Sequence, residues 1–151
     1  MQITITEILN ELAPLEAGVL RTRRVWVNFT AERIVGSAIF FPSSRRDVSA
    51  LSGQKFFVEV DRSTVTNFQR HGNDPLVSEI RPLAEKGNYH ITGQVNSVMY
   101  LDDEKQEAVI DLINQDIGFA AYSNEINGEL PNVGESVSFD LIELQLWDLN
   151  L

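Results

Sequence analysis

Alternating apolar and polar residues run through most of the chain and predict β-strands. Val25, Val27 and Phe29, for example, are separated by single residues, and Ile34 begins an almost continuous apolar run. A period of two is typical of a strand with one buried face, and a short apolar run between turn residues is typical of a buried strand. These patterns predict strands at residues 25–29, 34–41, 56–60, 63–68, 90–101, 107–114, 117–122 and 137–147.

The first fourteen residues have a helical spacing instead. Thr4 and Glu7 have the spacing of a capping box, and Pro14 prevents a clean continuation of a helix. Before Pro14, apolar residues recur at intervals of three or four, as on one buried helix face. These residues are Ile5, Ile8, Leu9 and Leu12. We therefore expect a short helix over residues 5–13.

Residues 69–88 interrupt the β pattern. Asp74 as an N-cap and Pro75 at the first helical position favour a second short helix through Ile80, which Pro82 would end. We interpret the segment as a long connection within one β-rich domain of residues 1–151, with a possible subdivision at this point.

The last predicted strand changes phase near Leu141 and Ile142. Val137 and Phe139 share one parity, whereas Leu144 and Leu146 share the other. Keeping both sets buried requires a bulge or a bend, so the strand can serve two sheets or turn a barrel corner. The fold class that follows is mainly antiparallel β, a sandwich or a partly open barrel with one short N-terminal helix.

Composition narrows the class of protein further. There is no cysteine, which excludes disulfides and thiolate metal sites. Glu7, Asn10 and Glu11 interrupt the apolar start that a secretory signal would need, and no apolar run has the roughly 20 residues that cross a bilayer. We expect a soluble, cytoplasmic protein with no membrane partner.

The net charge of −10 is concentrated late in the chain. Residues 88–151 contain twelve carboxylates and one base, a net charge of −11, whereas residues 1–87 have a net charge of +1. Carboxylates at turns and on outward strand faces keep many proteins soluble, but solubility is usually served by mixed signs. A folded surface of one sign favours a positively charged partner.

The predicted function is therefore non-enzymatic binding of a basic protein. Inhibition of a nuclease toxin is its most concrete form, because a bacterial immunity protein or antitoxin must rapidly occupy a basic active site. Aromatic side chains would anchor the contact. Alternation places Trp147 outward beside Glu143, whereas a tryptophan near a terminus as often folds back onto the core. The predicted partner-binding residues are Tyr100, Asp102, Asp103, Glu104, Glu107, Asp111, Asp116, Tyr122, Glu143 and Trp147.

An alternative function is single-stranded nucleic-acid binding by a β-barrel of the oligonucleotide-binding type. Arg21, Arg23, Arg24 and Trp26 place bases and an aromatic ring on one predicted strand, and residues 45–46 add two arginines in a nearby loop. Phosphate contacts and base stacking need such a combination. The net charge of −10 opposes it, and the arginines could equally pair with carboxylates such as Glu32, Asp47 or those late in the chain.

A hydrolase is the remaining alternative. The sequence contains no nucleophile elbow, phosphate-binding loop, zinc-protease motif or dinucleotide fingerprint. His71 and Asp74 could form a general-base pair in a loop, while His90 is expected to be structural. Residues 102–104 lack the alternating oxygen ligands and central glycine of a calcium loop, so we expect no metal and no cofactor. The oligomeric state stays undecided.

Overall fold

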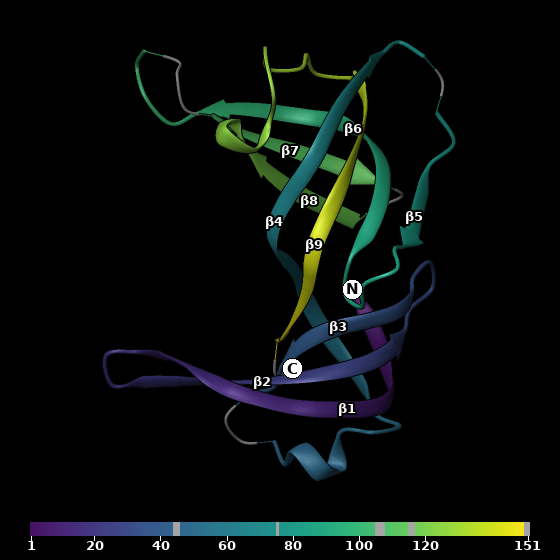
Figure 1. Ribbon diagram of the computed structural model, residues 1–151, viewed down its shortest axis with the longest axis vertical. Helices are drawn as coiled ribbons and strands as arrows, with labels where there is room; N and C mark the ends of the chain where they lie inside the picture. Colours follow the sequence, from purple (N-terminus) through teal and green to yellow (C-terminus); the bar gives the residue numbers. More distant parts are fainter. Residues whose placement is uncertain (44–45, 75, 105–107, 115–116, 150–151) are drawn as a thin grey trace. The chain divides into compact units, whose positions relative to one another are not determined.

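The computed structural model describes residues 1–43, 46–74, 76–104, 108–114 and 117–149 (Figure 1). The described chain is mainly β, as the sequence predicts. Its elements are β1 (Gln2–Ala17), β2 (Leu20–Thr30), β3 (Val35–Phe41), η1 (Val48–Ala50), β4 (Lys55–Gly72), β5 (Glu79–Pro82), β6 (Tyr89–Tyr100), β7 (Ala108–Asn114), β8 (Ile117–Tyr122), η2 (Ser123–Glu125) and β9 (Ser136–Asp148).

The chain divides into two compact units that share two strands. Unit 1 comprises Met1–Arg62, Ala84–Gly87 and Glu143–Leu151, and unit 2 comprises Ser63–Leu83 and Asn88–Ile142. β4 and β9 each contribute one half to each unit. The strand predicted at residues 63–68 is therefore not separate, because it continues β4 into unit 2.

Unit 1 contains a closed five-stranded barrel with the strand order β3-β2-β1-β4-β9. β1, β2 and β3 pair as antiparallel neighbours, β1 pairs antiparallel with β4, and a parallel pairing of β3 with β9 completes the ring. Alternate residues point into the barrel, where Val25, Val27, Phe29 and Phe40 are almost completely buried. Phe40 and Phe56 pack with their ring centroids 5.0 Å apart.

The hairpin of β1 and β2 extends beyond this barrel as a two-stranded ribbon (Figure 1). Leu12 to Ala17 pair with Arg24 to Leu20 and, within the described part of the chain, with no third strand. Val19 at the tip is 97% exposed. The ribbon therefore takes its order from cross-strand contacts and its attachment to the barrel.

The predicted N-terminal helix is wrong, because residues 5–13 lie within β1. Ile3 and Ile5 are buried with the alternation of a strand. Beyond them the β1–β2 register shifts three times, first between Ile5 and Glu7. Each bulge adds a residue to the two-residue repeat, and the resulting intervals of three imitate a helix face. The helix predicted from Asp74 to Ile80 is also wrong in the described residues: 76–78 lack regular structure, and Glu79 begins β5.

Unit 2 is a curved sheet in the order β4-β9-β6-β7-β8, with β5 paired to β6. β6 pairs with β9 up to Gln94 and with β7 from Gln94 onward. Phe139 on β9 packs 6.2 Å from both Phe68 and Phe119, measured between ring centroids. The Glu125 carboxylate accepts hydrogen bonds from the Val65 amide at 2.6 Å and the Thr64 hydroxyl at 2.9 Å, which ties η2 to β4.

The predicted phase change of the last strand is confirmed. Leu141 is buried in unit 2, Leu144 is buried in unit 1, and Ile142 between them is half-buried. Glu143 has a φ of 60°, a left-handed conformation that is rare for residues other than glycine. The reversal of facing therefore occurs at Glu143, where β9 passes from one unit to the other.

Candidate protein-binding surface

The outward face of β6, β7 and β8 carries several exposed apolar side chains. Register pairs residue 109 of β7 with both Met99 of β6 and Tyr122 of β8, so Met99 and Tyr122 lie on the same side of the sheet. Met99 is 61% exposed, Tyr122 is 45% exposed, and Ile113 on the same side of β7 is 39% exposed. Residues of the opposite parity, Ala108, Ile110 and Leu112, are buried, as the alternation predicts.

An acidic turn lies at one end of this face. Residues 102–107 connect β6 to β7 and contain four carboxylates and one lysine, a net charge of −3. Asp103 and Glu104 are exposed and Asp102 is half-buried. Tyr100, at the end of β6, is 46% exposed. Asp111 contributes another carboxylate to the face and accepts a hydrogen bond from the Asn96 amide at 2.9 Å.

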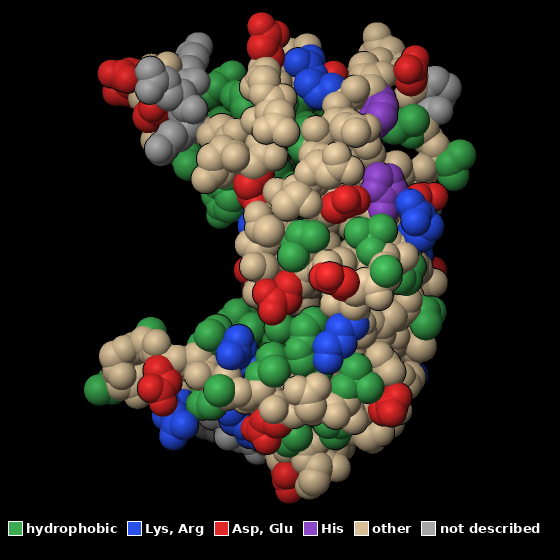
Figure 2. All heavy atoms as spheres, in the orientation of Figure 1, with side chains coloured by type: hydrophobic (Ala, Val, Ile, Leu, Met, Phe, Trp, Pro, Cys, Tyr) green, Lys and Arg blue, Asp and Glu red, His purple; other side chains and the backbone are tan. Residues whose placement is uncertain are grey.

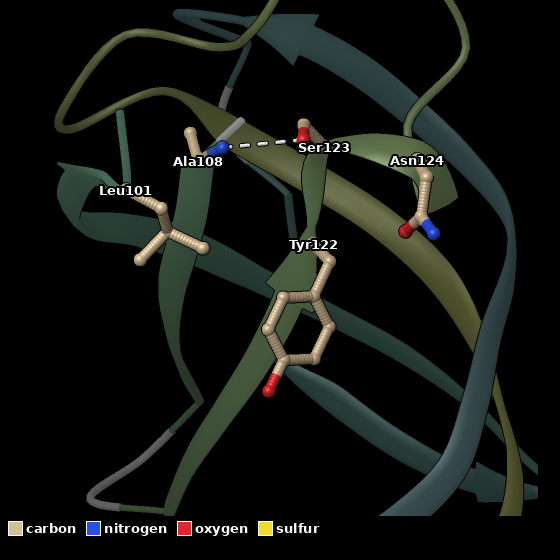
Figure 3. A pocket seen from close by; sticks show the side chains of 5 residues that line it. All are labelled: Leu101, Ala108, Tyr122, Ser123 and Asn124. Atoms are coloured by element: carbon tan, nitrogen blue, oxygen red, sulfur yellow. Dashed lines mark hydrogen bonds between the residues drawn. The ribbon is translucent and has the colours of Figure 1, made fainter. Parts of the chain in front are cut away.

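A hollow of about 300 Å³ opens at the base of the turn (Figure 3). Its lining comes from the two ends of the turn, the end of β8 and η2: Leu101, Ala108, Tyr122, Ser123 and Asn124. The Ser123 hydroxyl accepts a hydrogen bond from the Ala108 amide at 3.2 Å, which fixes η2 against β7. Of the predicted residues, Asp111 and Tyr122 thus lie on the outward face, and Asp102, Asp103 and Glu104 follow the end of β6. Tyr100 has the opposite parity, because it pairs with the inward Ala108.

Two other carboxylates late in the chain, those of Glu135 and Asp148, are buried in ion pairs within the fold. Asp148 is almost completely buried and pairs with Arg46 at 2.5 Å. Glu135 accepts two hydrogen bonds from the Arg70 guanidinium, at 2.8 and 2.9 Å. These bonds lower the pKa of Glu135 below its usual value and raise that of Arg70. On the face drawn in Figure 2, acidic side chains are scattered among others and do not merge into one surface.

The remaining predicted binding residues do not join this face. Glu143 and Trp147 belong to unit 1, whereas the residues around the turn belong to unit 2. Trp147 is half-buried and stacks on Phe41 with ring centroids 3.9 Å apart, so it is not the outward anchor that alternation predicted. Glu107 and Asp116 lie outside the described residues.

Met99, Leu101 and Ile113 are surface residues that the sequence reasoning did not select. Ile113 has the parity opposite to the inward Ile110 and Leu112, so alternation alone could have placed it outside. Leu101 and Met99 sit at the end of a strand, where burial depends on what the following turn covers. The sequence carries no local signal for that.

The side chains of both histidines have partners other than Asp74, which the sequence suggested as the partner of His71. The Nε2 atom of His71, on β4, lies 2.7 Å from the hydroxyl oxygen of Ser138, and Nδ1 of His90 lies 2.9 Å from an Asp140 carboxylate oxygen. Ser138 is buried, with 5% of its surface exposed. Among the described residues, no three acidic or histidine side chains cluster closely enough to hold a metal ion.

The basic residues of β2 are engaged with the ribbon and the barrel. Arg21 pairs with Glu16 at 3.1 Å, and the Arg24 guanidinium donates two hydrogen bonds to the Ala13 carbonyl at 2.9 and 2.7 Å. The Arg23 guanidinium donates to the Arg46 carbonyl at 2.5 Å. Arg45 lies outside the described residues.

Trp26, also on β2, is covered by the segment Ala84–Gly87. The Lys86 ammonium lies 4.6 Å from the centroid of the Trp26 ring. Gly87 donates from its amide to the Ser37 hydroxyl at 3.0 Å and accepts at its carbonyl from the Leu144 amide at 2.8 Å. This segment therefore covers one side of the Trp26 ring.

The two units differ sharply in charge. Unit 2 contains twelve carboxylates and three bases, a net charge of −9, whereas unit 1 contains ten carboxylates and nine bases, a net charge of −1. The acidic character of the chain thus belongs to one compact unit.

No protein-family model, curated protein or solved structure matches the chain. Within the described residues, no helix is both long and apolar enough to span a bilayer.

Proposed function

We propose that the chain is a non-enzymatic binding protein that caps a basic protein partner with the outward face of β6–β8. The observation that carries the proposal is the exposure of Met99 and Tyr122 on neighbouring strands, together with exposed Asp103 and Glu104 in the connection after β6, on a unit of net charge −9. Desolvated aromatic and apolar anchors supply affinity, and complementary charge raises the association rate by about 10- to 1,000-fold at low salt.

The most concrete form of this function is an immunity protein that inhibits a nuclease toxin. A nuclease active site is basic because it must hold phosphates, so an acidic cap would compete with the nucleic acid for the same cations. Rapid occupation of such a site is the task for which electrostatic steering is most useful.

The test compares two variants with the same change of charge. Asp103→Lys/Glu104→Lys reverses the acidic turn, whereas Glu11→Lys/Glu32→Lys reverses two exposed carboxylates of unit 1. The unmodified chain is used to recover partners from a lysate at low and high salt, and each recovered protein is purified. We expect a basic nuclease whose activity the chain inhibits and whose association rate falls at least tenfold more for the turn variant than for the control.

Two outcomes would overturn the proposal. Recovered proteins could be retained equally at low and high salt and keep their activity in the presence of the chain. Alternatively, both charge variants could slow association to the same extent, in which case net charge acts without a defined face.

We propose oligonucleotide binding by unit 1 as the second candidate. Its support is the barrel order β1-β2-β3-β9-β4 with the parallel β3–β9 pairing, which is the arrangement of oligonucleotide-binding barrels; these bind ligands on strands 2 and 3. Trp26 lies on the corresponding face. Fluorescence anisotropy with a labelled oligothymidylate would measure binding, and Trp26→Ala should weaken it roughly fivefold or more, while Phe57→Ala on β4 should not. Absence of binding at low salt would eliminate this candidate.

A further inference from the structure

The connection between η2 and β9 contains an asparagine followed directly by a glycine, Asn127 and Gly128. Residues 127–129 are exposed, whereas Ile126 before them and Pro131 after them are buried. A Cβ atom at Gly128 would meet no described atom within 4 Å, so the space around this part of the backbone is open. Water therefore reaches both residues, on a segment that is fixed at its two ends.

Hydrogen bonding does not restrain this pair of residues. Within the described part of the chain, neither the Asn127 side chain nor the Gly128 amide makes a hydrogen bond. Asn96 on β6 provides the contrast, because it also precedes a small residue, Ser97, but its side-chain amide donates to the Asp111 carboxylate at 2.9 Å. The Asn127 side chain can therefore approach the backbone of the residue that follows it, whereas the side chain of Asn96 is held away.

We propose that Asn127 is a site of spontaneous deamidation in the folded chain. The Gly128 nitrogen, after losing its proton to solvent, attacks Cγ of Asn127; the N–Cγ bond forms, the Cγ–Nδ2 bond breaks, and the leaving nitrogen takes up a proton as ammonia. Water then opens the cyclic imide at either carbonyl and gives aspartate or isoaspartate, with no change of oxidation state. Glycine favours ring closure because it has no Cβ atom and the widest choice of backbone conformations. Unit 2 gains one carboxylate, which changes its net charge from −9 to −10.

The modified chain should keep its fold. Before the site, the Glu125 carboxylate accepts a hydrogen bond from the Val65 amide at 2.6 Å, and after it the Glu135 carboxylate accepts one from the Asn132 amide at 2.9 Å. The extra backbone methylene of an isoaspartate is inserted between these two attachments, in the exposed residues of the connection. Deamidation therefore changes the surface charge of unit 2 without removing a contact that holds the sheet.

The test compares the folded chain with peptides of the same local sequence. The full chain and peptides of residues 125–131 and 93–99 are incubated at mildly alkaline pH in water enriched in heavy oxygen, and mass spectrometry locates the label incorporated on hydrolysis. Asn127 in the chain should react within about threefold of its peptide rate, whereas Asn96 should react at least about tenfold more slowly than its peptide, because β6 must open first. Protection of Asn127 by about tenfold or more would overturn the proposal, and so would an unprotected Asn96, since the reaction would then proceed through unfolding.

Two variants confirm the position by the charge of the intact chain. Asn127→Gln lengthens the side chain, so that cyclisation would require a larger ring, and Asn96→Gln is the matched control at the protected asparagine. Isoelectric focusing after incubation should show a more acidic band for the wild-type chain and for Asn96→Gln, and none for Asn127→Gln. An acidic band of wild-type intensity in Asn127→Gln would contradict the assignment. This result does not depend on the partner, so it stands or falls separately from the proposed function.

Discussion

Replacement of Gly87 by alanine should destabilise unit 1 by much more than the loss of backbone freedom alone. Gly87 has a φ of 82°, where a residue with a Cβ atom costs about 1–2 kcal/mol. A Cβ atom would also lie 2.7 Å from Cη2 and 2.8 Å from Cζ3 of the Trp26 ring. Ordinary contacts are 3.4 Å or longer, so the ring or the segment must move by several tenths of an ångström. Overpacking of this kind costs about 1–3 kcal/mol.

Gly53→Ala provides the matched control in the same unit. Gly53 also has a φ of 82°, but a Cβ atom there would meet no described atom within 4 Å. Urea unfolding followed by circular dichroism should therefore show a loss of about 1–2 kcal/mol for Gly53→Ala and about 2–5 kcal/mol for Gly87→Ala. Equal losses in the two variants would refute the reasoning, because the contact with Trp26 would then contribute nothing.

Three further changes test the carboxylates that are engaged inside the fold. Glu125→Ala removes the hydrogen bonds that this carboxylate accepts from the Val65 and Tyr122 amides and from the Thr64 hydroxyl. It should lower the free energy of unfolding, measured in urea, by about 3 kcal/mol. Wild-type stability would show that these hydrogen bonds do not stabilise the attachment of η2 to β4. Asp148→Asn leaves Arg46 without its buried counter-charge and should lower the free energy of unfolding by about 3 kcal/mol. The double variant Asp148→Asn/Arg46→Met should recover part of this loss in the same assay, and no recovery would argue against the ion pair. Because Arg70 lowers the pKa of Glu135 below 4.5, their pair stabilises the fold above pH 4.5 and is lost as the pH falls through the lowered pKa. The deficit of Glu135→Gln measured by urea unfolding should therefore shrink on acidification below pH 4.5, and a constant deficit would exclude the ionised pair as its cause.

The strands were predictable because their local pattern agrees with the tertiary burial. Residues 117–122 were predicted as a strand and form β8, and the buried parity of β7 follows directly from alternation. The N-terminal segment was mispredicted because its bulges depend on pairing with β2, which the sequence does not display. The phase change in β9 was visible, but the positive φ of Glu143 that produces it was not.

The candidate surface was only partly predictable. The chain segment that carries the charge could be read directly from the sequence, and its carboxylates Asp103 and Glu104 are exposed. The sequence does not show which carboxylates form ion pairs within the fold, because partners such as Arg46 and Asp148 are about a hundred residues apart. Trp147 was misplaced for the same reason, since its stacking on Phe41 depends on the parallel pairing of β3 with β9.

The division of β4 and β9 between the units has a consequence for the order of folding. The barrel of unit 1 draws strands from both sides of residues 63–142, so its last strand cannot join until that stretch has been crossed. Closing an unstructured loop of this length costs about 4 kcal/mol of chain entropy. Prior folding of the acidic unit would remove most of that cost by bringing β4 and β9 together, so the unit proposed to capture a partner would also act as a template for its neighbour during synthesis.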